Sequence, residues 1–188
     1  MKIGVLALQG AVREHCRSLR NCGVEPIEIK YLSQLTEING LIIPGGESTT
    51  VGKLLVKHRM LEPLAELGNK GLPIFGTCTG LIMLAKEISG SDQPRLGLMD
   101  ITVERNAFGR QIASFEKDLE IAELGPRPFH AIFIRAPYIK KAGPGVQVMA
   151  RLDERILFVR EKNFLAAAFH PELTPDLRIH QFFIKMCS

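Results

Sequence analysis

The chain has 188 residues, of which 46% are hydrophobic and 23% are charged. This composition is ordinary for a single globular domain and excludes a disordered or collagen-like chain. The net charge of +4 comes from basic residues scattered along the chain. It therefore indicates solubility more than nucleic-acid binding, for which the sequence carries no recognition motif.

The first half of the chain alternates short apolar runs with longer amphipathic stretches. This pattern is typical of a parallel sheet covered by helices on both faces. Strands are predicted at Lys2–Leu8, Glu25–Lys30, Leu41–Ile43 and Leu72–Phe75. Helices are predicted at Ala11–Cys22, which Gly23 closes, in two segments between Thr49 and Lys70, and at Leu81–Ile88. The sequence thus predicts an α/β fold in one domain that covers residues 1–188.

The second half, from Leu98 to Ala168, has strand-like runs separated by Gly or Pro, with little room for helices. We predict antiparallel strands that extend the sheet, formed by DITVER (100–105), QIAS (111–114), AIFIRAP (131–137), VQVMARL (146–152), RILFVR (155–160) and FLAAAF (164–169). A closing amphipathic helix is predicted at Pro175–Met186. Its expected core contacts are Leu177, Phe182, Phe183 and Ile184.

The cysteines show neither the CxxC pairs of a zinc site nor the density of a disulfide scaffold, so we expect four reduced thiols. The apolar run that opens the chain is too short for a signal peptide or a membrane span, and no later stretch is long enough. These features predict a cytoplasmic protein without a membrane partner.

The segment GTCTG at residues 76–80 lies where a buried strand must turn sharply into a helix. Small residues permit such a turn, and a thiol held there points beyond the carboxyl end of the sheet. A free cysteine is most often a buried packing residue. The glycine-flanked position of Cys78 favours a nucleophile instead, whereas Cys16, Cys22 and Cys187 have no such context and are assigned to packing or to the surface.

The second motif is FHPE at residues 169–172, directly after an apolar strand. Alternation puts His170 and Glu172 on one face, so the carboxylate can orient the imidazole while the imidazole takes the thiol proton. On its own this pair is as consistent with a solvated ion pair as with catalysis; Cys78 makes the catalytic interpretation much stronger. The remaining histidines lack a comparable partner in sequence and are expected at the surface or the edge of the core: His15, His58, His130 and His180.

The third motif is PGGESTT at residues 44–50, again between a buried strand and a helix. A phosphate-binding loop would need Gly at position 47 and Ser or Thr at position 54, but the chain has Glu47 and Leu54. An oxyanion hole fits better, with the backbone N–H groups of Gly46 and Thr79 as donors. A plain glycine turn remains the alternative.

These segments resemble the class I glutamine amidotransferases, and in particular the glutaminase subunits of pyridoxal 5'-phosphate synthase. The similarity covers nearly the whole chain, and its most specific parts are PGGESTT, VERNAFGRQ and FIRAP. It implies a flavodoxin-like three-layer α/β sandwich with a mixed, mostly parallel sheet. It also implies hydrolysis of L-glutamine through a thioester on Cys78, with His170 as base and acid, Glu172 as its orienter, and no cofactor or metal.

Residue-by-residue matching to this family implies a set of glutamine-binding residues: Gly46, Glu47, Ser48, Arg105, Ile134 and Arg135. The charges are reasonable, because a guanidinium group can meet the α-carboxylate of glutamine with two hydrogen bonds. Without the family, Arg105 and Arg135 would more simply be interpreted as surface ion pairs. Thr79 departs from the family, which commonly has Ala there. Its branched side chain is expected either to crowd the thiolate or to donate a hydrogen bond to it.

The resemblance also implies a protein partner, the (β/α)8-barrel synthase subunit that assembles the pyridoxal ring, in a hetero-oligomer with this chain. The turn Gln9–Gly10 lies near the contact expected from this family. Two rival functions remain open from the residues: a cysteine peptidase or deglycase-like hydrolase with the same elbow, and a non-catalytic binding subunit. The intact triad residues argue against the second, although Thr79 keeps it open.

Overall fold

The parallel half of the central sheet carries the loops that form the site. The computed structural model describes residues 1–105 and 114–188. In this part of the chain, ten strands form one sheet in the order β2-β1-β3-β4-β12-β11-β9-β6-β5, with β10 beside β11. The parallel strands are β2 (Glu25–Ile29), β1 (Lys2–Leu6), β3 (Gly40–Ile43), β4 (Ile74–Thr77) and β12 (Phe164–Ala167).

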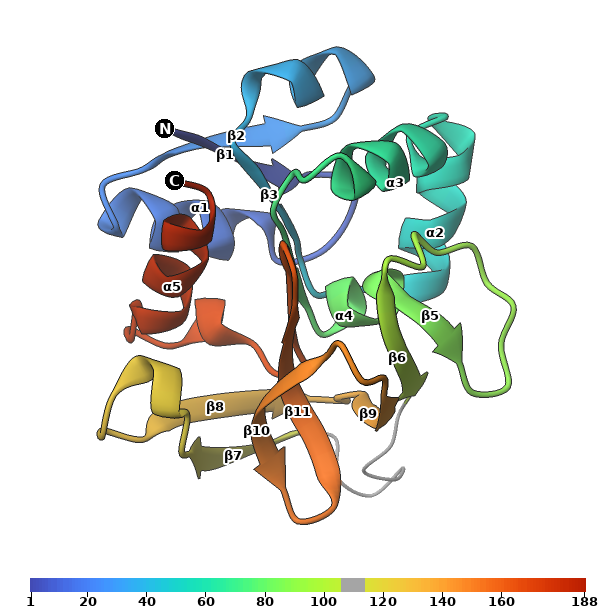
Figure 1. Cartoon of the computed structure of the whole chain (residues 1–188). Helices are drawn as coiled ribbons and strands as arrows, with labels where there is room; N and C mark the ends of the chain where they lie inside the picture. Colours follow the sequence, from blue (N-terminus) through green and yellow to red (C-terminus); the bar gives the residue numbers. More distant parts are fainter. Residues whose placement is uncertain (106–113) are drawn as a thin grey trace.

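Helices cover both faces of these strands, which explains why β1, β3, β4 and β12 are apolar along nearly their whole length. Figure 1 shows α1 (Val12–Asn21) and α5 (Arg178–Met186) on one side, and α2 (Ser48–Lys57), α3 (Leu61–Asn69) and α4 (Thr79–Leu84) on the other. Short 3-10 turns are η1 (Leu32–Glu37), η2 (Ala122–Leu124) and η3 (Pro171–Leu173). Among the described helices, none is long and apolar enough to cross a membrane.

The antiparallel extension predicted for the second half is present, with two corrections. FLAAAF (164–169) forms β12, which pairs parallel with β4, and AIFIRAP (131–137) lies outside this sheet. The extension consists of β6 (Met99–Glu104), β9 (Tyr138–Ala142), β10 (Gln147–Leu152) and β11 (Arg155–Glu161), with β5 (Ala85–Ile88) parallel to β6 at the edge. β11 also pairs antiparallel with β12 and so joins the two halves. The predicted α/β class, with a mostly parallel sheet and an antiparallel extension, is confirmed.

Three local predictions in this region need correction. The helix predicted at Leu81–Ile88 ends at Leu84, because residues Ala85–Ile88 pair with β6 as a strand. β9 was not predicted, since two of the five residues in its sequence YIKKA are lysines and only Ile139 is fully buried. β7 (Ser114–Leu119) and β8 (Phe129–Ile134) form a separate two-stranded sheet. The strand predicted at 111–114 lies outside the described residues except for Ser114.

The closing helix α5 begins at Arg178, three residues later than predicted. Of its expected core contacts, Phe183 is fully buried, and Phe182 and Ile184 pack half-buried against the core. Leu177 is half-buried at the N-cap.

The strand order places β1 between β2 and β3, so the chain reverses its direction of travel across the sheet at β1. At such a reversal, the loops after the two neighbouring strands run away from each other and leave a crevice at the carboxyl ends of the strands. Ligands of open α/β sheets bind in this crevice. Here those loops follow β1 and β3. The carboxyl ends of β4 and β12 lie next along the same edge.

Candidate active site

Cys78 occupies the sharp turn between β4 and α4. Its backbone has φ 49° and ψ −96°, a conformation that costs free energy for any residue other than glycine. The turn requires its two glycines, because a Cβ at Gly76 would overlap the backbone of Gly80, and one at Gly80 would overlap the carbonyl of Ile43. The Cys78 N–H donates to the carbonyl of Ala167 in β12 at 2.8 Å, which holds the thiol at the sheet edge.

His170 and Glu172 lie directly after β12, beside Cys78. The His170 side chain makes hydrogen bonds with Cys78 and with Glu172, the latter between Nδ1 and Oε1 at 2.7 Å. A backbone hydrogen bond from the His170 N–H to the carbonyl of Ile132 at 2.9 Å fixes the main chain that carries the imidazole. Glu172 is completely buried in η3. The three predicted triad residues are therefore in one row, thiol to imidazole to carboxylate.

The charges in this row keep the His170 imidazole protonated. Burial by itself would lower the pKa of His170, but the hydrogen bonds with Cys78 and Glu172 raise that pKa to about 10. Burial would likewise raise the pKa of Glu172, but the nearby His15 and the hydrogen bond from His170 outweigh it and lower that pKa. The row thus holds an imidazolium at neutral pH, and a positive group beside a cysteine stabilises its thiolate.

The loop after β3 is attached to both neighbouring loops. The Thr79 hydroxyl donates to the carbonyl of Gly46 at 2.6 Å, and the Glu47 N–H donates to Gln9 Oε1 at 2.7 Å. One peptide unit, Gly46–Glu47, is thereby held at its carbonyl by the nucleophile turn and at its N–H by the β1 loop. The expected bond from the Thr79 hydroxyl to the thiolate is replaced by this bond to Gly46.

The Glu47 carboxylate caps helix α2. It accepts hydrogen bonds from the backbone N–H groups of Thr49 at 2.9 Å and Thr50 at 2.7 Å, and from the Thr50 hydroxyl. The hydrogen bond with the Thr50 side chain is the largest of the effects that lower the pKa of Glu47, to about 2. The carboxylate is therefore already paired within the loop, so its contact with glutamine is not required to explain its place.

A pocket of about 480 Å³ opens in front of the Cys78 thiol. Its size is in the range of small-molecule sites. It is lined by residues from the β1, β3 and β4 loops and from the second half of the chain: Gln9, Gly45, Gly46, Glu47, Ser48, Cys78, Thr79, Ile82, Arg105, Ile134, Arg135, Pro137 and His170. All six residues predicted to bind glutamine are in this lining. Glu172 lies behind His170, and Gly10 lies behind Gly46, outside the lining.

The sequence reasoning missed a residue that organises the pocket wall. Gln93 is buried, and its Oε1 accepts hydrogen bonds from Arg105 Nη1 at 2.6 Å and from the Ser48 hydroxyl at 3.3 Å. It therefore holds two lining residues at once. Its segment has neither helical nor strand periodicity, so no sequence pattern pointed to it.

The placement of His15 and His180 at the surface or core edge was wrong, because both are completely buried. Helical periodicity contained the signal. His15 shares its helix face with Val12, Cys16 and Leu19, and His180 lies with Ile179 and Phe183. In contrast, His58 and His130 are exposed as expected. The predicted free thiols are also found at all four cysteines.

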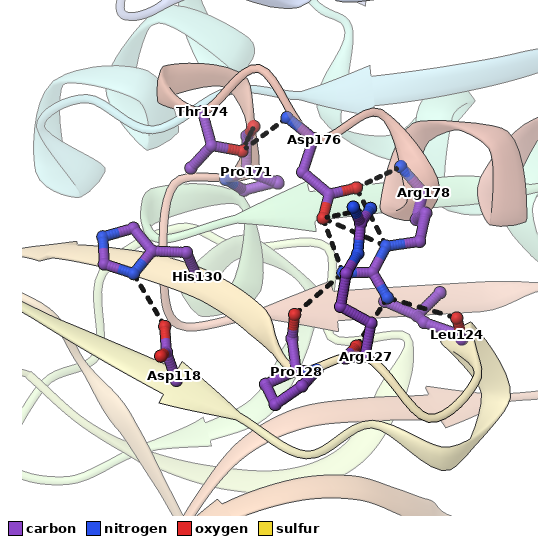
Figure 2. A network of polar contacts seen from close by, with 9 residues as sticks. All are labelled: Asp118, Leu124, Arg127, Pro128, His130, Pro171, Thr174, Asp176 and Arg178. Atoms are coloured by element: carbon purple, nitrogen blue, oxygen red, sulfur yellow. Dashed lines mark hydrogen bonds and ion pairs between the residues drawn. The ribbon is translucent and has the colours of Figure 1, made fainter.

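The segment after Glu172 is fastened to the loop before β8 by Arg178, as Figure 2 shows. Arg178 Nη1 donates to the carbonyls of Leu124 and Arg127, and Nη2 donates to the carbonyl of Pro128. Asp176 pairs with the same guanidinium group at 2.6 Å. Among residues 1–105 and 114–188, no group of three His, Cys, Asp or Glu side chains is placed to hold a metal ion.

A solved structure described as a glutamine amidotransferase has the same fold. It shares 48% sequence identity and superposes with a TM-score of 0.94 over 98% of each chain. The structure of PurLQS from Thermotoga maritima, 18% identical with a TM-score of 0.71, shares the fold over 100% of this chain and 98% of that one. The fold and the site together define a glutamine amidotransferase.

The model of the SNO glutamine amidotransferase family matches residues 5–188, and this chain belongs to that family. A relative from Pelotomaculum thermopropionicum, named pyridoxal 5'-phosphate synthase subunit PdxT, is 62% identical over 100% of this chain and 95% of its own length. A protein of the same name from Moorella thermoacetica is 60% identical over 99% of each chain.

Proposed function

We propose that this chain, as one domain over residues 1–188, hydrolyses L-glutamine to L-glutamate and ammonia and supplies the ammonia for pyridoxal 5'-phosphate synthesis. One observation carries the proposal: a buried row of thiol, imidazole and carboxylate borders a pocket of about 480 Å³ in a member of a glutamine amidotransferase family. The name shared by the two relatives described above supports the biosynthetic role.

The first half of the proposed reaction forms a thioester. The Cys78 thiolate attacks the side-chain amide carbon of glutamine, and negative charge develops on the former carbonyl oxygen. The backbone N–H groups of Gly46 and Thr79 are the proposed donors to this oxyanion. His170 then gives its proton to the departing nitrogen, so that the C–N bond breaks and ammonia leaves.

The second half releases glutamate. Neutral His170 takes a proton from a water molecule, whose oxygen attacks the thioester carbon. The C–S bond breaks, glutamate leaves, and the thiolate and imidazolium are restored. Glu172 keeps the imidazole in the orientation that both halves need, and it stabilises the positive charge each time His170 is protonated.

Substrate recognition is proposed to use both ends of the pocket. Arg105 and Arg135 bind the α-carboxylate of glutamine, for which a guanidinium group is well suited. Gly46, Glu47 and Ser48 lie along the substrate from the other side, and Ile134 contacts its methylene groups. The backbone of Arg135 has φ 43°, and strained residues of this kind are common where a side chain must point into a site.

The proposed partner is a (β/α)8-barrel synthase subunit that receives the ammonia in a hetero-oligomer with this chain. Ammonia is useful to the synthase only if it is delivered before it is protonated and lost. The turn Gln9–Gly10 is the proposed point of contact. Gln9 also holds the β3 loop, so a partner that docks at this turn would act on the loop beside Cys78. Four free cysteines are in keeping with a cytoplasmic location.

The test is glutamate release from L-glutamine by the purified chain, with and without the synthase subunit, with Cys78→Ala as the blank. Release that depends on Cys78 and rises with synthase supports both the reaction and the partner. If folded protein releases no glutamate in either condition, the proposal is wrong and a non-catalytic role replaces it.

Thiol reactivity separates the enzyme from a non-catalytic subunit without any partner. Burial raises the pKa of Cys16 and Cys22, and it raises that of Cys187 to about 12. Cys78 has the His170 imidazolium beside it, so we expect iodoacetamide at pH 7 to alkylate Cys78 first. Peptide mass spectrometry gives the order directly. Equal rates at all four cysteines would contradict an activated nucleophile.

A further inference from the structure

Behind the catalytic row, Glu172 is in contact with a second set of buried polar groups, and the other members of this set have no role in the proposed mechanism. Four elements contribute to it: α1 through His15, the end of β4 through Thr77, η3 through Glu172, and α5 through His180. All four side chains are at most 1% exposed. Buried polar groups persist in folded proteins when they are hydrogen-bonded or serve a function.

Glu172 reaches this set through its second oxygen. Oε1 is bound by His170, whereas Oε2 makes no hydrogen bond within the described residues. His15 Nε2 faces this second oxygen at 3.4 Å. A buried carboxylate with only one of its oxygens hydrogen-bonded is costly, so a polar N–H group at this distance stabilises its charge.

The contacts of His15 determine where its proton lies. A carboxylate oxygen only accepts, so Nε2, which faces Glu172, carries the hydrogen. Nδ1 is then an acceptor and receives the Nε2–H of His180, at 3.0 Å. This leaves His180 Nδ1 as a bare acceptor, in agreement with its lack of a hydrogen bond within the described residues. The opposite arrangement would bury an unpaired N–H and set two acceptors against each other.

Thr77 connects the same set to the loop after β3. Its Oγ1 accepts the Nε2–H of His15 and the N–H of Gly45, each at 3.1 Å. The hydrogen bond of His15 Nε2 is therefore with Thr77, and its contact with Glu172 Oε2 at 3.4 Å is electrostatic. His15 is thus in contact with both sides of the site, the carboxylate behind the imidazole and, through Thr77, the residue before Gly46. It does not line the pocket.

We propose that His15 is a positioning residue for the glutaminase reaction. Its Nε2–H, hydrogen-bonded to Thr77 and oriented by His180, lies against the Glu172 carboxylate and stabilises its negative charge, so that Glu172 supports the His170 imidazolium. The inference rests on the proposed function only for its effect on turnover. Its effect on Cys78 reactivity requires neither glutamine nor a partner.

The charge states around His15 suit this role. Burial is the main reason that the pKa of His15 is lowered, and it lowers the pKa of His180 to about 3. Both rings are neutral at physiological pH, so the direction of their hydrogen bond is constant. The charged or titratable groups that act on His15 are Glu172 and His170 from the opposing segment, His180 from α5, and Glu14 on its own helix.

The experiment measures the rate of Cys78 alkylation by iodoacetamide as a function of pH, in the full chain. His15→Leu removes the donor, and His15→Gln keeps an N–H at the Nε2 position. The acid limb of the profile, where the thiolate is protonated, is expected to move up by about one pH unit in His15→Leu, a tenfold slower reaction on that limb. His15→Gln should recover most of the shift, and His58→Leu is the matched substitution of an exposed histidine.

His180→Leu removes the residue that orients His15 without touching Glu172, and it should shift the limb in the same direction. If circular dichroism shows that His15→Leu does not fold, the alkylation profile of His180→Leu tests the proposal in its place. An acid limb that stays at its original pH in a folded variant of either kind overturns the proposal. The proposal is also overturned if the acid limb of His15→Gln lies at the same pH as that of His15→Leu. A positioning role depends on the Nε2–H, which glutamine keeps, whereas a purely structural role does not.

Turnover gives the second measurement. With the synthase present, His15→Leu should lower kcat for glutamate release at least tenfold and leave KM within about threefold, since His15 is outside the pocket. A change confined to KM would contradict a positioning role. If the unmodified chain releases no glutamate, the proposed function fails, while the alkylation profile still decides the role of His15.

Discussion

At the scale of single residues, the properties of the site depend on which polar groups already have hydrogen-bond partners within the protein. The Thr79 hydroxyl and the Glu47 carboxylate both face the pocket region, yet each has a partner within the protein. A group that is bonded inside the loop contributes to the shape of the site more than to its charge. This distinction is invisible in a sequence motif, because it depends on which partner each group finds.

The substitution Thr79→Ala tests this for the residue next to the nucleophile. The change removes the hydrogen bond to the Gly46 carbonyl and leaves the Thr79 backbone N–H in place. We expect glutamate release to stay within about tenfold of the original, which corresponds to about 1.4 kcal/mol in the barrier. Thr79→Ser, which keeps the hydroxyl, is the control. A gain of several hundredfold in Thr79→Ala would show that the threonine suppresses the nucleophile.

The substitution Glu47→Ala tests the helix cap. Loss of the two backbone hydrogen bonds should lower the free energy of unfolding by about 1 kcal/mol at pH 7. Because the folded-state pKa of Glu47 is lowered to about 2 from 4.5, this stabilisation is fully present above pH 4.5 and lost as the pH falls towards 2. Urea titrations at pH 7 and pH 3 measure the difference.

Glu62→Ala, which removes an exposed glutamate in the first turn of α3, provides the comparison for the Glu47 variant. It should change stability by no more than about 0.5 kcal/mol, the size of a helix-dipole effect at the surface. A pH-independent loss in Glu47→Ala would contradict the assignment of its carboxylate as the cap.

At the scale of elements, the structure shows why local patterns failed in the second half of the chain. Residues Ala85–Ile88 follow α4 without a helix-breaking residue, yet their pairing with β6 makes them a strand. β9 is a strand because β6 and β11 supply its hydrogen-bonding partners on either side. In both cases the neighbouring strands decide the conformation, which is the usual way that tertiary contacts override propensity.

Arg178 provides a test of how elements are held together beside the site. Its guanidinium group joins the start of α5 to three backbone carbonyls before β8 (Figure 2). We expect Arg178→Ala to lower the free energy of unfolding by about 2–3 kcal/mol, because it removes several charge-assisted hydrogen bonds together. Chemical denaturation followed by circular dichroism measures this.

Arg127→Ala is the matched control for Arg178. Arg127 also reaches Asp176, at 3.5 Å, but its side chain is 74% exposed. An exposed ion pair of this kind should cost less than about 1 kcal/mol. Equal losses in the two variants would mean that the carbonyl contacts of Arg178 do not matter for stability.

At the scale of the whole molecule, the site is assembled from residues that are far apart in the chain. Gln9, Gly46, Cys78 and His170 follow β1, β3, β4 and β12, four strands that are adjacent and parallel in the sheet. Parallel strands end at the same edge, so the loops after them meet there. Gln9 is the member of this group closest to the start of the chain, and it binds the β3 loop through the Glu47 N–H.

Gln9→Ala tests whether this loop contact responds to the proposed partner. Loss of the contact releases one end of the Gly46–Glu47 peptide, so we expect synthase-stimulated glutamate release to fall about tenfold. Gln9→Glu keeps an oxygen acceptor for the Glu47 N–H and should retain more activity. The measurement is glutamate release at saturating synthase. If Gln9→Ala turns over at the original stimulated rate, the role assigned to Gln9 is wrong.

The sequence by itself determined the α/β class, the positions of the parallel strands, and the motifs around Cys78, His170 and Gly46. These follow from local properties: apolar runs, glycine-permitted turns and residue spacing. Only the tertiary structure decided the roles that depend on partners distant in the chain. The burial of His15 against Glu172, the contact of Gln93 with Arg105, and the pairing of β5 and β9 each join segments whose proximity follows from the packing of the whole sheet.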